Sequence, residues 1–131
     1  MSIKVEDYYP RETFNKMKAF ADQHETPFVV IDTAIISQAY DDLRAGFEFA
    51  KVYYAVKANP AIEIIELLRD KGSNFDIASI YELDKVLSAG VSPDRMSYGN
   101  TIKKARDVRY FYEKGVRCLL YTSDAADEED S

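Results

Sequence analysis

The chain has 131 residues, of which 47% are hydrophobic and 31% charged, so it is long enough for one domain with a hydrophobic core. No apolar run approaches the roughly 20 residues that a membrane-spanning helix needs, and the first residues lack the apolar stretch of a signal peptide. The net charge of −6 comes from the last residues: without the five acids of 118–131, 17 bases face 18 acids, and no charge excess favours nucleic acid or an anionic membrane.

The first half of the chain alternates between apolar residues at helical spacing and short continuous apolar runs. The helical spacing predicts amphipathic helices, and runs of about five apolar residues predict buried strands. Gly46 ends the second helical segment and Gly72 follows the third, as glycine commonly does at the end of a helix. The elements expected in chain order are a helix over 10–22, a strand over 27–31, a helix over 33–46, a strand over 52–56 and a helix over 61–71.

The second half repeats this strand–helix unit. The expected elements are a strand over 74–77, a helix capped near Ser79 and ending at Gly90, a strand over 95–98, a further helix, and a strand beginning at 115–117. Phe75, Met96 and Val116 are 21 and 20 residues apart, which is the period of a compact strand–helix unit. Strands and helices that alternate at this pace predict a parallel sheet.

Two α/β architectures fit this pattern, a (β/α)8 barrel and an open doubly wound sheet. No glycine-rich nucleotide-binding motif follows any strand, which weakens the second alternative. A (β/α)8 barrel needs about 250 residues, so this chain would supply roughly its N-terminal half.

The run Tyr53-Tyr54-Ala55-Val56-Lys57-Ala58-Asn59-Pro60 places one lysine at the end of a buried strand. Such an amine can form a Schiff base with an aldehyde, and pyridoxal 5'-phosphate (PLP) is the common aldehyde cofactor. Catalytic groups of a barrel lie at the carboxyl ends of its strands, where Lys57, Asp76 and the turn 98–100 are all expected. The alternatives are a solvated lysine at position 57 and a cap or turn residue at position 76.

Histidine and cysteine are too scarce for a metal-site pattern. His24 is the only histidine and lies in a polar segment, so we expect it in a surface loop. The single cysteine, Cys118, cannot form an internal disulfide, which fits the reducing cytoplasm.

Residues 118–131 differ from the rest of the chain. They read as a solvated acidic terminus, but residues 118–128 also resemble the translation of a transposase adapter used in sequencing libraries. We favour the second interpretation. It divides the chain into a partial α/β domain over 1–117 and a non-native tail over 118–131, in which Cys118 has no functional role.

Three motifs together resemble the fold-type III PLP-dependent decarboxylases. They are the segments 54–60 (Tyr-Ala-Val-Lys-Ala-Asn-Pro), 74–79 (Asn-Phe-Asp-Ile-Ala-Ser) with Glu82 following, and 90–95 (Gly-Val-Ser-Pro-Asp-Arg). Segment 98–103 (Tyr-Gly-Asn-Thr-Ile-Lys) is similar to the ornithine decarboxylase branch, and the whole stretch resembles bacterial enzymes that accept ornithine and sometimes lysine.

The resemblance implies that residues 1–117 form a partial PLP-binding barrel domain. It also implies that Lys57 binds PLP covalently, that Asp76 lies close to the cofactor and active site, and that Asn59 and Glu82 support them. It implies a small amino-acid substrate and the decarboxylation of ornithine to putrescine, or of lysine to cadaverine, in polyamine biosynthesis. It also implies that the full-length protein is a cytoplasmic homodimer. The remaining catalytic groups would follow residue 117, so we expect the 131-residue chain itself to be inactive. The alternatives are a diaminopimelate, arginine or carboxynorspermidine decarboxylase of the same fold, or a non-catalytic homologue.

Overall fold

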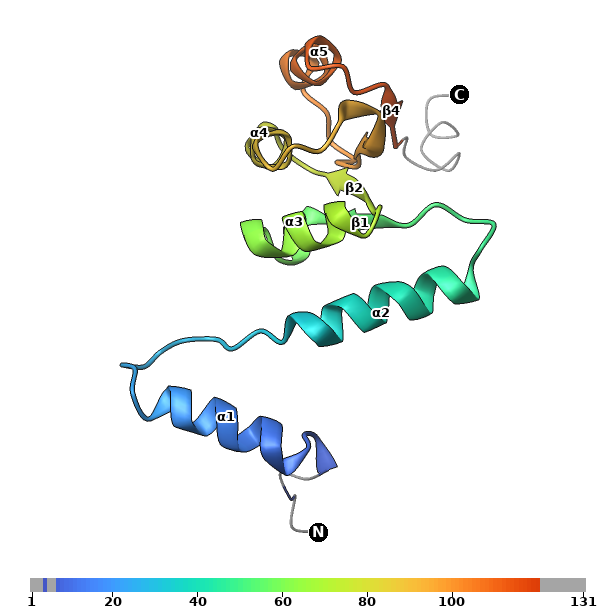
Figure 1. The fold of residues 1–131 in the computed structure, drawn as a ribbon. Coiled ribbons are helices and arrows are strands. Elements are labelled where there is room, and N and C mark those ends of the chain that lie inside the picture. Colours follow the sequence, from blue (N-terminus) through green and yellow to red (C-terminus); the bar gives the residue numbers. More distant parts are fainter. Residues whose placement is uncertain (1–3, 5–6, 121–131) are drawn as a thin grey trace, which may run out of the picture. The chain divides into compact units, whose positions relative to one another are not determined.

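The computed structural model describes residue 4 and residues 7–120. The contacts within the chain divide it into two compact units, Met1–Asp32 and Thr33–Ser131. Helix α1 (Arg11–Ala21) belongs to the first unit, and the sheet with its helices belongs to the second (Figure 1). Among the described helices, none combines the length and the apolar character that crossing a membrane requires.

The first unit contains one confirmed element and one correction. Helix α1 covers nearly the range expected from the sequence, and His24 is exposed as predicted, with its ring stacked on Phe20 at a centroid distance of 3.7 Å. Residues 27–31, however, form no strand, and Val29 is 84% exposed. The predicted strand is wrong because an apolar run becomes a strand only where another strand accepts its backbone hydrogen bonds.

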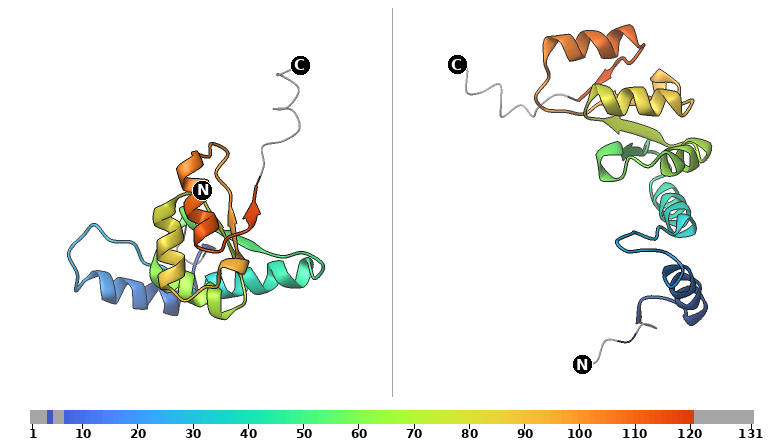
Figure 2. Two further views of the ribbon diagram at one scale, coloured as in Figure 1. Left: turned by 90° about the horizontal axis from the view of Figure 1, so that it is seen from above. Right: turned by 90° about the vertical axis from the view of Figure 1, so that its left-hand side faces the viewer.

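The second unit begins with helix α2 (Thr33–Gly46) and continues as a four-stranded parallel sheet. The strands lie in the order β1-β2-β3-β4, which is also their order in the chain. Helices α3, α4 and α5 lie along one side of this sheet (Figure 2), and short 3-10 turns η2 (Val56–Ala58) and η3 (Pro93–Arg95) adjoin β1 and β3. The elements are β1 (Tyr53–Ala55), α3 (Ile62–Asp70), β2 (Asn74–Ile77), α4 (Ile80–Ser88), β3 (Met96–Tyr98), α5 (Ala105–Glu113) and β4 (Cys118–Leu119).

The pairing register is constant across the sheet. Tyr54 pairs with Phe75, and Phe75 pairs with Met96, each 21 residues further along the chain. Ser97 pairs with Cys118 at the same spacing, so the last strand starts after the predicted range 115–117. Strand β4 therefore consists of the first two residues of the segment assigned to the tail, and residues 121–131 of that segment lie outside the described residues.

The hydrophobic core lies between the sheet and the helices. Alternate strand residues point to the helices, so Phe75 and Ile77 of β2 are fully buried while Asp76 between them is only half-buried. On β3, the ring of Tyr98 stacks on Phe111 of α5 with centroids 3.9 Å apart. The opposite face of the sheet carries both polar and apolar residues, among them Asp76, Ser97 and Ala55, and it is the face that would line a barrel.

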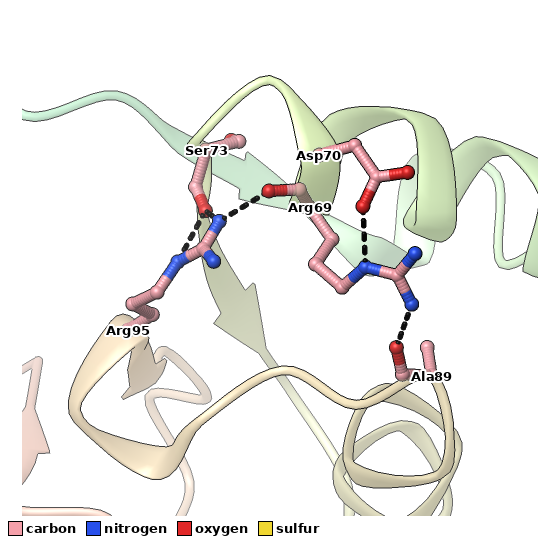
Figure 3. A network of polar contacts seen from close by, with 5 residues as sticks. All are labelled: Arg69, Asp70, Ser73, Ala89 and Arg95. Carbon is pink, nitrogen blue, oxygen red and sulfur yellow. Dashed lines mark hydrogen bonds and ion pairs between the residues drawn. The ribbon is translucent and has the colours of Figure 1, made fainter.

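Arginine side chains close the carboxyl ends of two helices (Figure 3). Arg95 donates from Nη2 to the Arg69 carbonyl at 2.9 Å, at the end of α3, and from Nε to the Ser73 carbonyl at 3.1 Å. Arg69 in turn donates to the Ala89 carbonyl at the end of α4, and its Nε lies 2.7 Å from Asp70. A cation at a helix carboxyl end bonds to the last carbonyls and complements the helix dipole. These contacts therefore join consecutive strand–helix units of the sheet.

Candidate active site

Lys57 lies just beyond the carboxyl end of β1. The strand ends at Ala55, Val56 is fully buried, and Lys57 is exposed in the short turn η2. Asn59 fixes this turn: its backbone carbonyl accepts a hydrogen bond from the Tyr54 hydroxyl at 3.1 Å. The buried anchor on one side and the Asn59 contact on the other hold the lysine at the strand end.

The side chain of Asn59 also links this turn to the next helix. Its Oδ1 accepts a hydrogen bond from the backbone N–H of Ala61 at 3.0 Å, immediately before α3. The two contacts of Asn59 therefore hold the segment between Lys57 and α3 in place.

The Lys57 amine is unpaired in the part of the chain that the structure describes, with neither a hydrogen bond nor an ion pair. It lines a hollow of about 360 Å³ whose other lining residues are Pro60, Ser79, Tyr81, Glu82 and Lys85. The second lysine of this hollow is engaged, because Lys85 Nζ donates to the Pro60 carbonyl at 3.0 Å. An accessible and unpaired amine is what reaction with an aldehyde requires.

Glu82 shapes one wall of this hollow through backbone contacts. Its carboxylate accepts a hydrogen bond from the N–H of Ala78 at 2.8 Å, and its own N–H donates to Ser79 Oγ at 3.3 Å. These reciprocal bonds resemble a capping box and fix the start of α4, confirming Ser79 as the predicted helix cap. The Glu82 carboxylate is held by the backbone at the edge of the lysine hollow.

Asp76 lies on β2, opposite Ala55 of β1 and Ser97 of β3. Its Oδ1 accepts a hydrogen bond from Ser97 Oγ at 3.0 Å. The carboxylate lines a second hollow, of about 280 Å³, on the face of the sheet away from the helices. Tyr53 borders the same hollow, and burial, followed by the nearby Cys118, raises the pKa of its hydroxyl.

Lys57 and Asp76 come from adjacent strand–turn segments, as the sequence predicts, but they line different hollows. No ion pair joins them, and within the described residues the carboxylate of Asp76 is bonded to β3 instead.

The turn after β3 is tied to its neighbours on both sides. Asn100 donates from Nδ2 to the Ala78 carbonyl at 3.1 Å, which joins this turn to the one after β2. Lys103 donates to the carbonyls of Asn100 and Leu120, the second at 2.5 Å, which joins it to the end of β4. The carboxyl ends of β2, β3 and β4 thus form one connected edge.

Residues 33–128 match the family model of the pyridoxal-dependent decarboxylases, pyridoxal binding domain. The chain belongs to this family. The match, together with the parallel sheet, confirms the predicted α/β class and the partial PLP-binding barrel.

Similar proteins are decarboxylases of basic amino acids. The chain is 38% identical over 92 residues to ornithine decarboxylase of Saccharomyces cerevisiae, covering 70% of this chain and 20% of that protein. It is 36% identical over 106 residues to lysine/ornithine decarboxylase of Selenomonas ruminantium, covering 81% and 27%. The crystal structure of lysine decarboxylase from Selenomonas ruminantium superposes with a TM-score of 0.77 at 29% identity, covering 98% and 32%. The pyridoxal-binding domain described here therefore spans less than a third of each protein's length.

Lys57 of this pyridoxal-binding domain suits the cofactor that the family name implies. PLP carries an aldehyde, and the hollow beside Lys57 offers an unpaired amine beside the hydroxyl-bearing residues Ser79 and Tyr81. Among the described residues, no cluster of three or more acidic, histidine or cysteine side chains could hold a metal ion.

Ser97 and Lys103 contact the carboxyl-end edge of the sheet, but the sequence alone does not identify either of them as a site residue. Ser97 reads as an ordinary strand residue, and its contact with Asp76 depends on the register of two strands. The 21-residue period offered a signal, because it aligns position 76 with position 97. Lys103 has no such signal, since its partner at Leu120 is set by the path of the loop.

Proposed function

We propose that the protein containing this domain is a PLP-dependent decarboxylase that acts on ornithine and secondarily on lysine, producing putrescine or cadaverine for polyamine biosynthesis. The names of the relatives from yeast and Selenomonas ruminantium support this substrate class. We also propose that the whole protein is a cytoplasmic homodimer, as the motif resemblance in the sequence implies. Arginine, diaminopimelate and carboxynorspermidine are the alternative substrates to be tested.

The observation that carries the proposal is the unpaired Lys57 amine at the end of β1. Lys57 would hold the cofactor through a covalent bond to its aldehyde carbon, for which the nitrogen must act as a neutral nucleophile. When bound, PLP supplies a ring that takes up the electrons left by the departing carboxylate. Arginine at this position would keep the positive charge but could not form the bond, because its guanidinium stays protonated.

The surrounding residues would position Lys57 and shape the space beside it. Asn59 holds the turn, and Glu82 and Ser79 hold the start of α4 across the hollow. Asp76 contributes a carboxylate on the adjoining strand, available to a cationic group of the substrate or cofactor. The ammonium groups of ornithine and lysine can donate charge-assisted hydrogen bonds to such a carboxylate.

The proposal is tested first on the 131-residue chain by labelling. The chain is incubated with limiting PLP, reduced with borohydride, and digested, and the labelled lysines are identified by mass spectrometry. We expect label at Lys57 in clear excess over the exposed Lys104, and loss of that excess in Lys57→Ala. The matched control Lys104→Ala should leave the labelling of Lys57 unchanged. Equal labelling of both lysines would contradict the proposed role of Lys57.

The activity is tested on the complete gene product. Release of carbon dioxide is measured with ornithine, lysine, arginine, diaminopimelate and carboxynorspermidine, for the unsubstituted protein and for Lys57→Ala and Lys57→Arg. We expect turnover with ornithine or lysine and a loss of several orders of magnitude in both variants. Turnover retained in Lys57→Ala would contradict the mechanism, and activity confined to diaminopimelate would contradict the substrate assignment.

A further inference from the structure

The Asp76 carboxylate lies close to two residues of the neighbouring strand and turn, Ser97 and Gly99. Ser97 is 98% buried on β3, opposite Asp76 in the register, and its hydroxyl donates to Asp76 Oδ1 at 3.0 Å. A buried hydroxyl that donates to a carboxylate makes a charge-assisted hydrogen bond, which is stronger than one between neutral groups. This contact draws the Asp76 side chain across the sheet toward β3.

Gly99 provides the space that the carboxylate then occupies. A Cβ atom at position 99 would lie 2.5 Å from Asp76 Cγ, well inside van der Waals contact, and would also overlap the carboxylate oxygens. The backbone cannot easily retreat, because the N–H of Gly99 donates to the Ile77 carbonyl at 2.8 Å. A side chain at position 99 and the observed Asp76 orientation therefore exclude each other.

The second carboxylate oxygen of Asp76, Oδ2, makes no hydrogen bond within the described part of the chain. Asp76 is half-buried and lines the inner-face hollow with Tyr53, Ala55 and Ser97. An ionised carboxylate has about four acceptor positions, and the single bond from Ser97 uses one of them. The held carboxylate thus keeps acceptor capacity toward the face of the sheet that would line the barrel.

We propose that Ser97 and Gly99 are positioning residues for Asp76, fixing its carboxylate against β3 so that its free acceptor positions serve a hydrogen-bond donor or cation bound on the inner face. This inference rests on the proposed function insofar as that donor belongs to substrate or cofactor. Ser97 acts by its hydroxyl and Gly99 by its missing side chain. Neither residue needs to touch the reacting atoms.

The test measures the side-chain rotamer of Asp76 in the isotopically labelled 131-residue chain by NMR, from three-bond couplings that report its χ1 angle, without cofactor. We expect values of a single rotamer in the unsubstituted chain and averaged values in Ser97→Ala. Ser97→Thr keeps the hydroxyl and should restore the single rotamer. Gly99→Ala should change the couplings of Asp76, whereas Gly46→Ala, where a Cβ meets nothing within 4 Å, should not.

Averaged couplings in the unsubstituted chain, or couplings unaffected by both Ser97→Ala and Gly99→Ala, would overturn the proposal. Should Gly99→Ala fail to fold, the comparison of Ser97→Ala with Ser97→Thr decides the matter. Because the couplings are recorded without PLP, they are independent of the proposed function. Failure of PLP to label Lys57 would count against that function and leave the rotamer result standing.

Discussion

Replacing Arg95 by methionine should remove the link between consecutive strand–helix units while keeping most of the side-chain volume. The substitution leaves the carbonyls of Arg69 and Ser73 without their charged donor. A hydrogen bond to a charged group contributes about 1.5–3 kcal/mol, and water can partly replace the donor because Arg95 is half-exposed. We therefore expect the free energy of unfolding to fall by about 2–4 kcal/mol.

The assay is urea denaturation followed by circular dichroism. With a slope of about 2 kcal/mol per molar urea, the expected loss lowers the midpoint by about 1–2 M. Arg109→Met is the matched control, because Arg109 is exposed on α5, and such surface changes usually stay within about 0.5 kcal/mol. If Arg95→Met destabilises the chain no more than Arg109→Met does, the arginine contacts of Figure 3 do not hold consecutive strand–helix units together.

Three further predictions concern the helices that cover the sheet. Phe111→Ala removes a fully buried ring and should cost about 3–5 kcal/mol in calorimetry, and a loss below 1 kcal/mol would contradict the packing described. Ser79→Ala removes the cap of α4 and should cost about 1 kcal/mol in urea denaturation, whereas the exposed Ser88→Ala should be nearly neutral. The hydrogen bond to Asp84, followed by burial, raises the pKa of Tyr110 above 10.0. The Tyr110 hydroxyl therefore stabilises the fold fully below pH 10.0, and this stabilisation is lost as the pH rises through the raised pKa. The difference in unfolding free energy between the unsubstituted chain and Tyr110→Phe should therefore be constant below pH 10.0 and shrink above it, and a difference that persists at higher pH would contradict this linkage.

Much of the second unit could be predicted because its signals are local. The strand over 74–77 has the predicted bounds, and the cap at Ser79 lies where the sequence predicts a helix cap. The 21-residue spacing of Phe75 and Met96 is the actual register of β2 and β3. Each of these follows from alternation, capping chemistry or period, which neighbouring residues in the sequence determine.

The features that could not be predicted depend on partners elsewhere in the structure. The apolar run 27–31 resembles a strand in composition, but strand formation needs a paired neighbour that the sequence does not specify. Lys57 follows the strand in a turn of its own, so its side chain lines a hollow separate from that of Asp76. The contact of Asp76 with Ser97 and the close approach to Gly99 require the register and the backbone path of three segments together.

The strands of the sheet lie side by side in the same order as in the chain, and this affects how the sheet can form. Every strand pairs only with strands 21 residues before or after it, so the loops that must close are all of similar and modest length. The entropic cost of closing a loop rises only slowly with its length, so the strand pairings of this sheet carry similar closure costs. Each strand–helix unit can therefore pair with the one before it without waiting for a strand from further along the chain.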